Sequence, residues 1–364
     1  MMLDSQADAL TFPRGDLALG FCRKCAFVSN VLFDRSLQDY SAGYEEQQSF
    51  SPRFREFQSQ LIARLIERYD LRRKAVVEIG CGKGDFLLEL CEVGDNCGVG
   101  IDPTCDPARM EGRADGRVRF IAEYYGDTHA DLPCDFLCCR HTLEHIHPTH
   151  EFVRRMREVV GTRSETLVFF ELPAVERVLS EKAFWDVYYE HCSYFSLGAL
   201  ARLFRANRFD IVELEADFSG QYLVITARPV GDPTEASLPA ENDLERVADS
   251  VALFQHHITA AIEDWRSRIV GLRSQGKRIA VWGSGSKCVA FLCTIGMGDA
   301  VGDIVDVNPY RHGKWLAGVG KQVVAPAELR KRPPDVVIIM NPVYRDEIGS
   351  DLRSMGLEPE LLCV

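Results

Sequence analysis

Three proton-handling side chains lie within four positions of this sequence: Tyr188, Glu190 and His191. A histidine beside a carboxylate can serve as a general base, and a tyrosine hydroxyl can donate to a developing oxyanion. The structural alternative is a capped helix start, because Ser196 precedes an apolar face that begins at Leu197. Both interpretations can hold, since the cap would fix the position of the loop before it.

A second chemical feature is the glycine-rich turn at residues 78–86, which follows an apolar strand predicted over 75–79. Glycine lets a turn reverse tightly and lets a ligand approach the backbone, and the helix start behind it presents unpaired N–H groups. The sequence Glu-Ile-Gly-Cys-Gly-Lys-Gly resembles motif I of class I S-adenosylmethionine (SAM) methyltransferases. The resemblance implies SAM contacts from Glu78, Gly80, Cys81, Gly82, Gly84 and Phe86.

An acid ends the next predicted strand, which covers residues 98–102. Asp102 lies 18 residues beyond Gly84, where dinucleotide-type folds place a carboxylate that accepts from ribose hydroxyls. The alternative is a solvated turn aspartate before Pro103. The preceding glycine turn favours ribose binding, so we expect both Asp102 and Pro103 to contact the cofactor.

Two further strand ends supply the remaining cofactor candidates. Strands predicted over 118–122 and 134–139 reach the carboxyl edge of the sheet, where doubly wound folds bind ligands. In methyltransferases the segment after the third strand usually contacts adenine. The resemblance implies contacts from Glu123, Tyr124, His141 and Thr142.

The segment 141–145 also matches the pattern H-x-x-E-H, an inverted zinc-protease signature. A zinc protease of this type needs the motif in the middle of a helix and a third ligand downstream. Here the residues come directly off a buried strand, which disfavours a metalloprotease.

The elements that position these residues predict an α/β fold with a doubly wound sheet. An amphipathic helix over 52–69 precedes the first strand, and a fifth strand over 166–172 brings Glu171 to the same edge. Strands over 209–214 and 222–228 complete the sheet as an antiparallel hairpin. We place a SAM domain at 46–228, after an N-terminal segment at 1–45.

A second, smaller α/β unit is predicted at 277–364. A proline- and acid-rich linker and a long amphipathic helix, together 229–276, lead into it. It begins with a strand and a glycine turn and holds Asp306, 21 residues beyond Gly285. The third glycine of G-x-G-x-x-G is missing, so the dinucleotide fingerprint is incomplete, but Lys287 and the helix start could hold a phosphate. Its last strand is expected over 336–340, ending at Asn341.

Composition excludes several classes of protein. A net charge of −12 provides no basic field for nucleic acid or an anionic membrane, and no apolar run reaches the length of a membrane span. The thirteen cysteines are scattered and mostly embedded in apolar strands, which indicates reduced thiols. With no basic and apolar leader at the N-terminus, we expect a cytoplasmic protein with a small-molecule substrate.

Cys22 and Cys25 form a C-x-x-C knuckle before a strand-like Phe27-Val28. Such a knuckle often supplies half of a four-thiolate zinc site. No second C-x-x-C occurs in the chain, so a bound zinc ion and a metal-free remnant both stay open.

The order of these parts resembles the nucleotide-sugar C-methyltransferases, over nearly the whole chain. The shared features are the cysteine knuckle, the SAM domain with an E-H-x-x-Y-F-S loop, and a Rossmann-like C-terminal unit with D-x-N-P-x-x-x-G-K. In that family a keto-sugar on a nucleoside diphosphate is methylated at the carbon beside the carbonyl. The resemblance implies that His191 removes the ring proton, that Glu190 orients it, and that Tyr188 steadies the enolate oxygen.

The resemblance also implies that the C-terminal unit helps to hold the substrate. Around this cleft we expect substrate contacts from Glu171, Gln221, Tyr222, Gly283, Ser284, Gly285, Lys287, Asp306, Asn308, Lys314 and Asn341.

Three departures from the family pattern bear on the substrate. The first zinc C-x-x-C pair is absent, and the family's Y-x-Y-x-S-S segment is replaced by residues 40–48, where Tyr44 is the candidate active-site tyrosine. The family's G-G-S-x-R is replaced by residues 219–222, which indicates an altered sugar pocket. Alternatives to C-methylation are an O-methyltransferase, in which the histidine deprotonates a hydroxyl, and an NAD-dependent oxidoreductase using the C-terminal loop.

Overall fold

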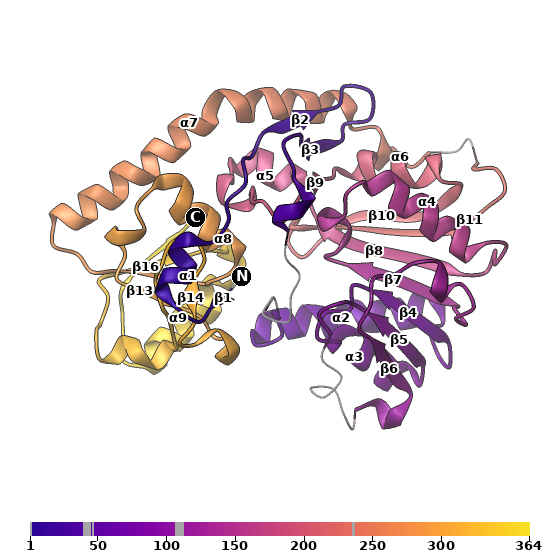
Figure 1. Ribbon diagram of the computed structural model, residues 1–364, viewed down its shortest axis with the longest axis horizontal. Coiled ribbons are helices and arrows are strands. Elements are labelled where there is room, and N and C mark those ends of the chain that lie inside the picture. Colours follow the sequence, from indigo (N-terminus) through magenta and orange to yellow (C-terminus); the bar gives the residue numbers. More distant parts are fainter. Residues whose placement is uncertain (1, 39–44, 46, 106–112, 235–236) are drawn as a thin grey trace.

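The computed structural model describes residues 2–38, 45, 47–105, 113–234 and 237–364. Two α/β lobes lie side by side, and one long helix passes over both of them (Figure 1). The predicted α/β fold, a doubly wound sheet followed by a second, smaller α/β unit, is confirmed.

The larger lobe is built on a seven-stranded sheet. Its strands are β4 (Ala75–Ile79), β5 (Cys97–Ile101), β6 (Val118–Ile121), β7 (Phe136–Arg140), β8 (Leu167–Pro173), β10 (Phe209–Asp217) and β11 (Tyr222–Pro229). Their order is β10-β11-β8-β7-β4-β5-β6, and only β11 runs antiparallel to its neighbours. The other six strands point the same way, so the carboxyl ends of β4 to β8 meet at one edge, which positions the candidate site.

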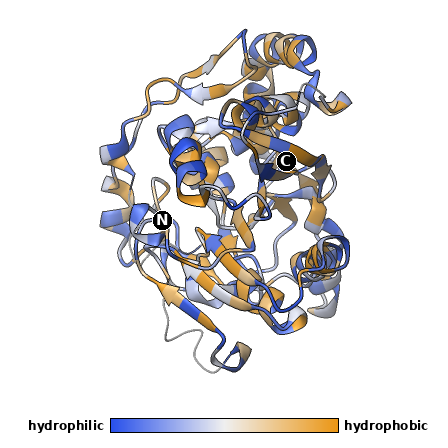
Figure 2. Ribbon diagram, turned by 90° about the vertical axis from the view of Figure 1, so that its right-hand side faces the viewer, coloured by the Kyte–Doolittle hydropathy of each residue, from blue (hydrophilic) through white to orange (hydrophobic). Residues whose placement is uncertain are grey.

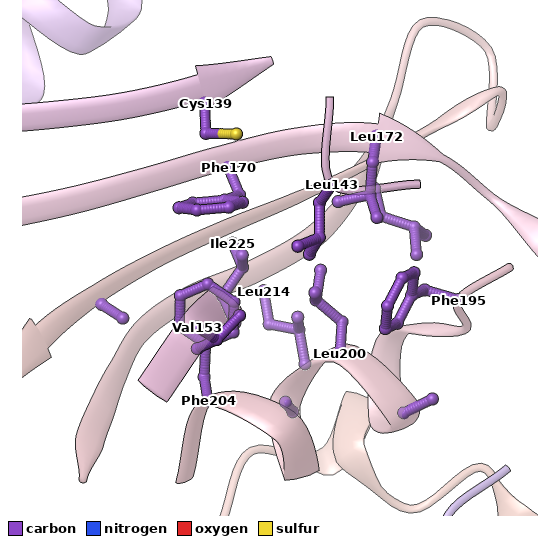
Figure 3. Close-up of a cluster of buried hydrophobic side chains, with 14 of the residues drawn as sticks. Cys139, Leu143, Val153, Phe170, Leu172, Phe195, Leu200, Phe204, Leu214 and Ile225 are labelled. Carbon is purple, nitrogen blue, oxygen red and sulfur yellow. The ribbon is translucent and has the colours of Figure 1, made fainter. Parts of the chain in front are cut away.

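Both faces of this sheet are buried under helices. The helices are α2 (Pro52–Tyr69), α3 (Asp85–Gly94), α4 (Thr149–Val160), α5 (Val175–Glu181) and α6 (Leu197–Ala206). Strand β8 contributes Phe169 to the α2–α3 face and Phe170 to the α4–α6 face, because successive side chains of a strand point in opposite directions. Figure 3 shows Phe170 above Phe204 and Leu200 in the second of these cores.

The residues that cap the helices explain where two of them begin. Ser51 accepts from the Phe54 amide ahead of α2, and Pro52 occupies the first turn, where its missing N–H costs nothing. Ser196 accepts from the Ala199 amide at 3.2 Å, as the sequence predicts. This cap fixes the end of the loop that carries His191.

The smaller lobe has a five-stranded parallel sheet. Its strands are β12 (Ile279–Trp282), β13 (Asp303–Val305), β15 (Val323–Val324), β16 (Val336–Ile339) and β17 (Glu360–Cys363), with helices α8 (Ser286–Ile295) and α9 (Arg345–Ser354). The order is β15-β13-β12-β16-β17. The expectation that the last strand is the one over 336–340 is wrong, because β17 pairs with β16. Strand β17 lies at the edge of the sheet and has one buried residue, so it gives a weaker apolar signal than β12 and β16, which are buried throughout.

Helix α7 (Leu244–Ser274) connects the lobes (Figure 1). Val247, near its start, is buried in the core of the larger lobe, and Ile269, near its end, is buried in that of the smaller lobe. Figure 2 shows hydrophobic and hydrophilic residues mixed along the helices, while the central strands are predominantly hydrophobic.

The N-terminal segment contacts both lobes. Strand β1 (Met2–Leu3) pairs with β14 (Trp315–Leu316) of the smaller lobe, and α1 (Gln6–Thr11) follows it. Strands β2 (Leu19–Phe21) and β3 (Val28–Asn30) form a hairpin that continues into β9 (Ser193–Tyr194) of the larger lobe. The hairpin thus lies directly against the loop that carries His191.

Candidate active site

A cavity of about 850 Å³ is lined by residues of both lobes. All of the predicted cofactor residues line it: Glu78, Gly80, Cys81, Gly82, Gly84, Phe86, Asp102, Pro103, Glu123, Tyr124, His141 and Thr142. So do most of the predicted catalytic and substrate residues: Tyr188, His191, Gln221, Tyr222, Gly283, Ser284, Gly285, Lys287, Asp306, Asn308 and Asn341. The tertiary structure therefore brings segments from across the chain to one space.

The glycine turn after β4 has the backbone geometry that only glycine adopts readily. Gly80, Gly82 and Gly84 have φ values of +70°, +51° and +78°. A Cβ on Gly80 would lie 2.0 Å from Thr142 Oγ1, so the close approach of the β7 loop also requires glycine there. The turn therefore forms a cradle for the backbone-side contacts of a ligand.

Asp102 stabilises this turn through hydrogen bonds. Its Oδ2 accepts from the Gly82 amide at 2.9 Å, and its Oδ1 accepts from both the amide and the hydroxyl of Thr104 at 2.7 Å. The carboxylate lines the cavity, but it has a structural task that sequence reasoning missed. Its contact with ribose stays a prediction.

Glu78 lies under the turn with its side chain almost fully buried. Burial raises the pKa of Glu78 to about 8, although Arg140 acts in the opposite direction. Among the described residues no group donates to Glu78 Oε2. A buried carboxylate with an unpartnered oxygen beside a glycine cradle fits a cofactor that carries positive charge, as SAM does.

His191 is buried and its Nε2 lies 2.9 Å from the hydroxyl of Tyr188. Burial lowers the pKa of His191 well below its usual range, and the neighbouring ring of His145 acts in the same direction. The imidazole is therefore neutral and can accept a proton.

The predicted orienting role of Glu190 is wrong. Its carboxylate does not line the cavity, and its backbone carbonyl accepts from His145 Nδ1 at 2.9 Å. The carboxylate near His191 is that of Glu144, whose Oε1 lies 4.0 Å from His191 Nε2. Burial raises the pKa of Glu144 to about 8, so the two groups are both neutral rather than an ion pair. Adjacency in the sequence did not identify this carboxylate, because Glu144 comes from the segment after β7, far from His191 in sequence.

Glu144 and His145 come from the one-turn helix η5 (Leu143–His145), directly after β7. The sequence placed them at the correct sheet edge, in the H-x-x-E-H segment, but their packing against His191 depends on the tertiary fold. As expected, the segment is not in the middle of a helix. The predicted Tyr44 lies outside the described residues.

Two predicted substrate residues do not line the cavity. Glu171 is buried behind it, where its Oε1 lies 2.8 Å from both Arg140 Nη2 and His141 Nε2. Lys314 forms an ion pair with Asp4 on the surface of the smaller lobe. The strand-end position of Glu171 was predicted correctly, but its side chain supports neighbouring residues instead of facing a ligand.

The second glycine turn repeats the arrangement of the first. Asp306 Oδ2 accepts from the amide and hydroxyl of Ser284 at 2.8 and 2.6 Å, and its Oδ1 accepts from the Asn308 amide. Arg311 Nη1 lies 3.1 Å from the same carboxylate. A Cβ on Gly285 would lie 3.5 Å from Arg311 Nη1, so this guanidinium, which sequence reasoning missed, flanks the start of α8.

Lys287 is already paired across the lobes. Its Nζ lies 2.6 Å from Asp186 Oδ1, and Arg177 Nη1 lies 2.8 Å from Asp186 Oδ2. Burial lowers the pKa of Lys287, while Asp186 acts in the opposite direction. The cationic groups at this end of the cavity are therefore Lys287, Arg177 and Arg311, with one carboxylate between the first two.

Gln221 and Asn341 also meet across the lobes. Each side-chain amide donates to the carbonyl of the other, at 3.1 and 2.9 Å. Both residues were predicted as substrate contacts, and both line the cavity. In this structure the two side chains therefore hydrogen-bond to each other.

The Cys22–Cys25 knuckle forms the tight turn between β2 and β3. Backbone N–H groups of Lys24 and Cys25 lower the pKa of Cys22, and burial raises that of Cys25. Among the described residues, no third potential metal ligand joins these thiols. The zinc site therefore stays a prediction, and the two thiols are the ligands that the described residues offer for it.

Within the described part of the chain, no helix has the length and apolar character needed to cross a membrane.

Comparison with known proteins matches two family models. Residues 53–214 match a methyltransferase domain, and residues 226–357 match a C-methyltransferase C-terminal domain. The chain is 26% identical over 291 residues to the C-methyltransferase NovU of Streptomyces niveus, covering 75% of this chain and 67% of that protein.

Two solved structures match about half of this chain. The 1,6-didemethyltoxoflavin-N1-methyltransferase of Burkholderia thailandensis matches at 20% identity and a TM-score of 0.37, covering 48% of this chain and 78% of that one. The magnesium protoporphyrin IX methyltransferase of Synechocystis matches at 13% identity and a TM-score of 0.37, covering 52% and 91%. The first family match lies in the larger lobe, and the second runs from β11 through α7 into the smaller lobe. The protein is a SAM-dependent methyltransferase.

Proposed function

We propose that this enzyme methylates the carbon beside the ketone of a nucleotide-activated keto-deoxysugar. The observation that carries the proposal is the buried His191, hydrogen-bonded to the Tyr188 hydroxyl and lining the same cavity as the SAM turn. A carbon acid next to a ketone needs this pairing of a base with an oxyanion donor.

The residues around the first glycine turn would hold SAM. Glu78 and Asp102 supply carboxyl groups and the turn supplies a close-approaching backbone, and all of these residues line the cavity. When bound, SAM supplies an electrophilic methyl group.

His191 Nε2 would take the proton from the carbon beside the ketone. The electron pair of the broken C–H bond moves to the carbonyl, and the Tyr188 hydroxyl donates to the oxygen on which negative charge develops. The carbon of this enolate would be the nucleophile, and its new bond to the methyl group would form as the sulfonium C–S bond breaks. The electron pair of that bond would stay on the sulfur of the departing S-adenosylhomocysteine, and the ketone would be restored. The imidazolium of His191 then returns its proton to solvent.

Two partly buried guanidinium groups support a diphosphate-bearing substrate. Arg177 Nη2 and Arg311 Nε have no hydrogen-bond partner among the described residues, and both side chains line the cavity. Arg311 flanks the start of α8, whose Gly285 N-cap provides no side-chain acceptor for the first amides. Charged donors at a helix start are what a diphosphate requires.

The test of the base is His191→Asn in the full chain. Calorimetric titration should show S-adenosylhomocysteine binding within about twofold of the wild type, while turnover of a nucleoside-diphosphate keto-deoxysugar falls by about 10²-fold or more. His150→Asn is the matched control, because His150 is exposed on α4 and lies outside the cavity. Full activity in the His191 variant would remove this residue as the base.

Isotope exchange separates carbon from oxygen as the methyl acceptor. In deuterium oxide without SAM, the wild type should exchange the proton beside the ketone, and the His191→Asn variant should not. A methylated product formed without any such exchange, with the new methyl group on oxygen by mass spectrometry, would identify an O-methyltransferase instead.

A further inference from the structure

Three metal-ligating side chains converge at one wall of the cavity: Glu144, His145 and His191. One donor atom from each lies within 4.8 Å of the other two. A tetrahedral shell with bonds of about 2.1 Å places its ligands about 3.4 Å apart. Movements below about 1 Å would therefore bring the three donors into coordination.

The surroundings of each donor suit a metal ligand. His145 donates from Nδ1 to the backbone carbonyl of Glu190, which fixes the tautomer with the lone pair on Nε2; ligating histidines are usually held in this way. Glu144 is 2% exposed, lines the cavity, and its Oε2 has no hydrogen-bond partner among the described residues. A buried carboxyl oxygen without a donor is what a cation would satisfy.

This ligand set differs from the one that the H-x-x-E-H motif indicates. In that signature His141 and His145 would both bind the metal, but His141 pairs with the buried Glu171. Its place is taken by His191, which is distant in sequence and arrives on the loop before α6. Two imidazoles and a carboxylate form the ligand set of catalytic zinc sites that keep a fourth position open.

We propose that Glu144, His145 and His191 form a binding site for a divalent transition-metal ion such as Zn²⁺. The metal would bond to His191 Nε2 and displace the Tyr188 hydroxyl that now lies 2.9 Å from it. In the proposed function, on which this consequence rests, the same lone pair accepts the substrate proton. The enzyme with the metal ion bound is therefore inhibited. The ion regulates the active site by competing with the substrate proton.

Zinc titration by calorimetry tests the site without any need for turnover. The background is the full chain with Cys22→Ser and Cys25→Ser, which removes the knuckle thiols as competitors. We expect one Zn²⁺ per chain, and an affinity at least about tenfold weaker when Glu144→Gln or His145→Gln is added. His150→Asn is the control and should leave the affinity unchanged. No binding in this background, or equal affinity in all variants, would overturn the site. Binding of S-adenosylhomocysteine shows that each variant is folded.

Turnover measurements test the inhibition. Methyl transfer should fall in proportion to site occupancy, with half inhibition at the calorimetric Kd, and a chelator should restore it. Undiminished turnover with the site filled would overturn the inhibitory role. The two proposals fail separately, because absent zinc binding leaves keto-sugar methylation intact, and absent methylation leaves the calorimetric site intact.

Discussion

At the scale of single residues, carboxyl groups in this cavity have different tasks because their surroundings differ. Asp102 and Asp306 each accept from several N–H and O–H donors and hold a turn in place. Glu78 and Glu144 are buried, each with one oxygen that has no hydrogen-bond partner in the part of the chain that the structure describes, and burial raises the pKa of both to about 8. The burial of each carboxyl group and the number of donors around it therefore determine its task.

Glu78→Gln should change how stability depends on pH. The pKa of Glu78 is raised in the fold from 4.5 to about 8, so its contribution is fully present below pH 4.5 and is lost as pH rises to about 8. The free energy of unfolding of the variant relative to wild type should therefore increase across this window by a few kcal/mol, at about 1.4 kcal/mol per pKa unit.

The measurement is denaturant unfolding of the SAM-free chain at several pH values. Glu165→Gln is the control, because that side chain is 95% exposed on the surface. A difference between Glu78→Gln and wild type that stays constant from pH 4.5 to 8 would show that Glu78 is already ionised in the fold.

At the scale of elements, the two glycine turns have the same arrangement of strand, turn, helix and carboxylate. Each joins a central parallel strand to a helix, and each is held by a carboxylate from the end of the neighbouring strand, Asp102 for the first and Asp306 for the second. The first turn differs in being pressed against the β7 loop, where Thr142 Oγ1 occupies the place of a Cβ on Gly80.

Gly80→Ala should destabilise the first turn and weaken cofactor binding. The positive φ and the contact with Thr142 together should cost about 2 kcal/mol of stability, and the affinity for S-adenosylhomocysteine should fall by about tenfold or more. Calorimetry and thermal unfolding measure the two effects.

Thr142→Ala should recover part of the loss in the Gly80→Ala background, because it removes the closest atoms. Gly231→Ala is the matched control, since a Cβ there meets nothing within 4 Å. Equal effects of the Gly80 and Gly231 substitutions would show that the close approach is unimportant.

At the scale of the whole molecule, the cavity exists only because the two lobes are held together. Helix α7 is buried at one end in each core, Lys287 pairs with Asp186, and Gln221 exchanges two hydrogen bonds with Asn341. The amide pair and the ion pair both lie at the cavity, so substrate binding and lobe contact share residues.

A double-mutant cycle measures the coupling between Gln221 and Asn341. Substituting both by alanine, singly and together, should give a coupling free energy of about 1 kcal/mol in unfolding experiments, because the pair makes two hydrogen bonds. The same cycle between Gln221 and Asn308 is the control and should give less than about 0.5 kcal/mol. Equal couplings in the two cycles would mean that the amide pair does not join the lobes.

The sequence by itself determined the fold class and the cofactor turn, because both depend on local order. A strand, three glycines and a helix with Phe86 on its buried face leave little choice of backbone, and Asp102 ends the next strand wherever the sheet lies. The edge strand β17 was missed because only one of its four residues is buried, whereas all four residues of β12 and of β16 are buried.

Only the tertiary structure decided which side chains face one another. Glu144 rather than Glu190 lies beside His191, Glu171 lies behind the cavity, and Lys314 lies on the outer surface. Sequence spacing sets the position of a residue along the backbone, but the direction of its side chain and its neighbours depend on how loops from distant strands pack. The acid–base site is made of such loops, and so its partners became visible only in the folded chain.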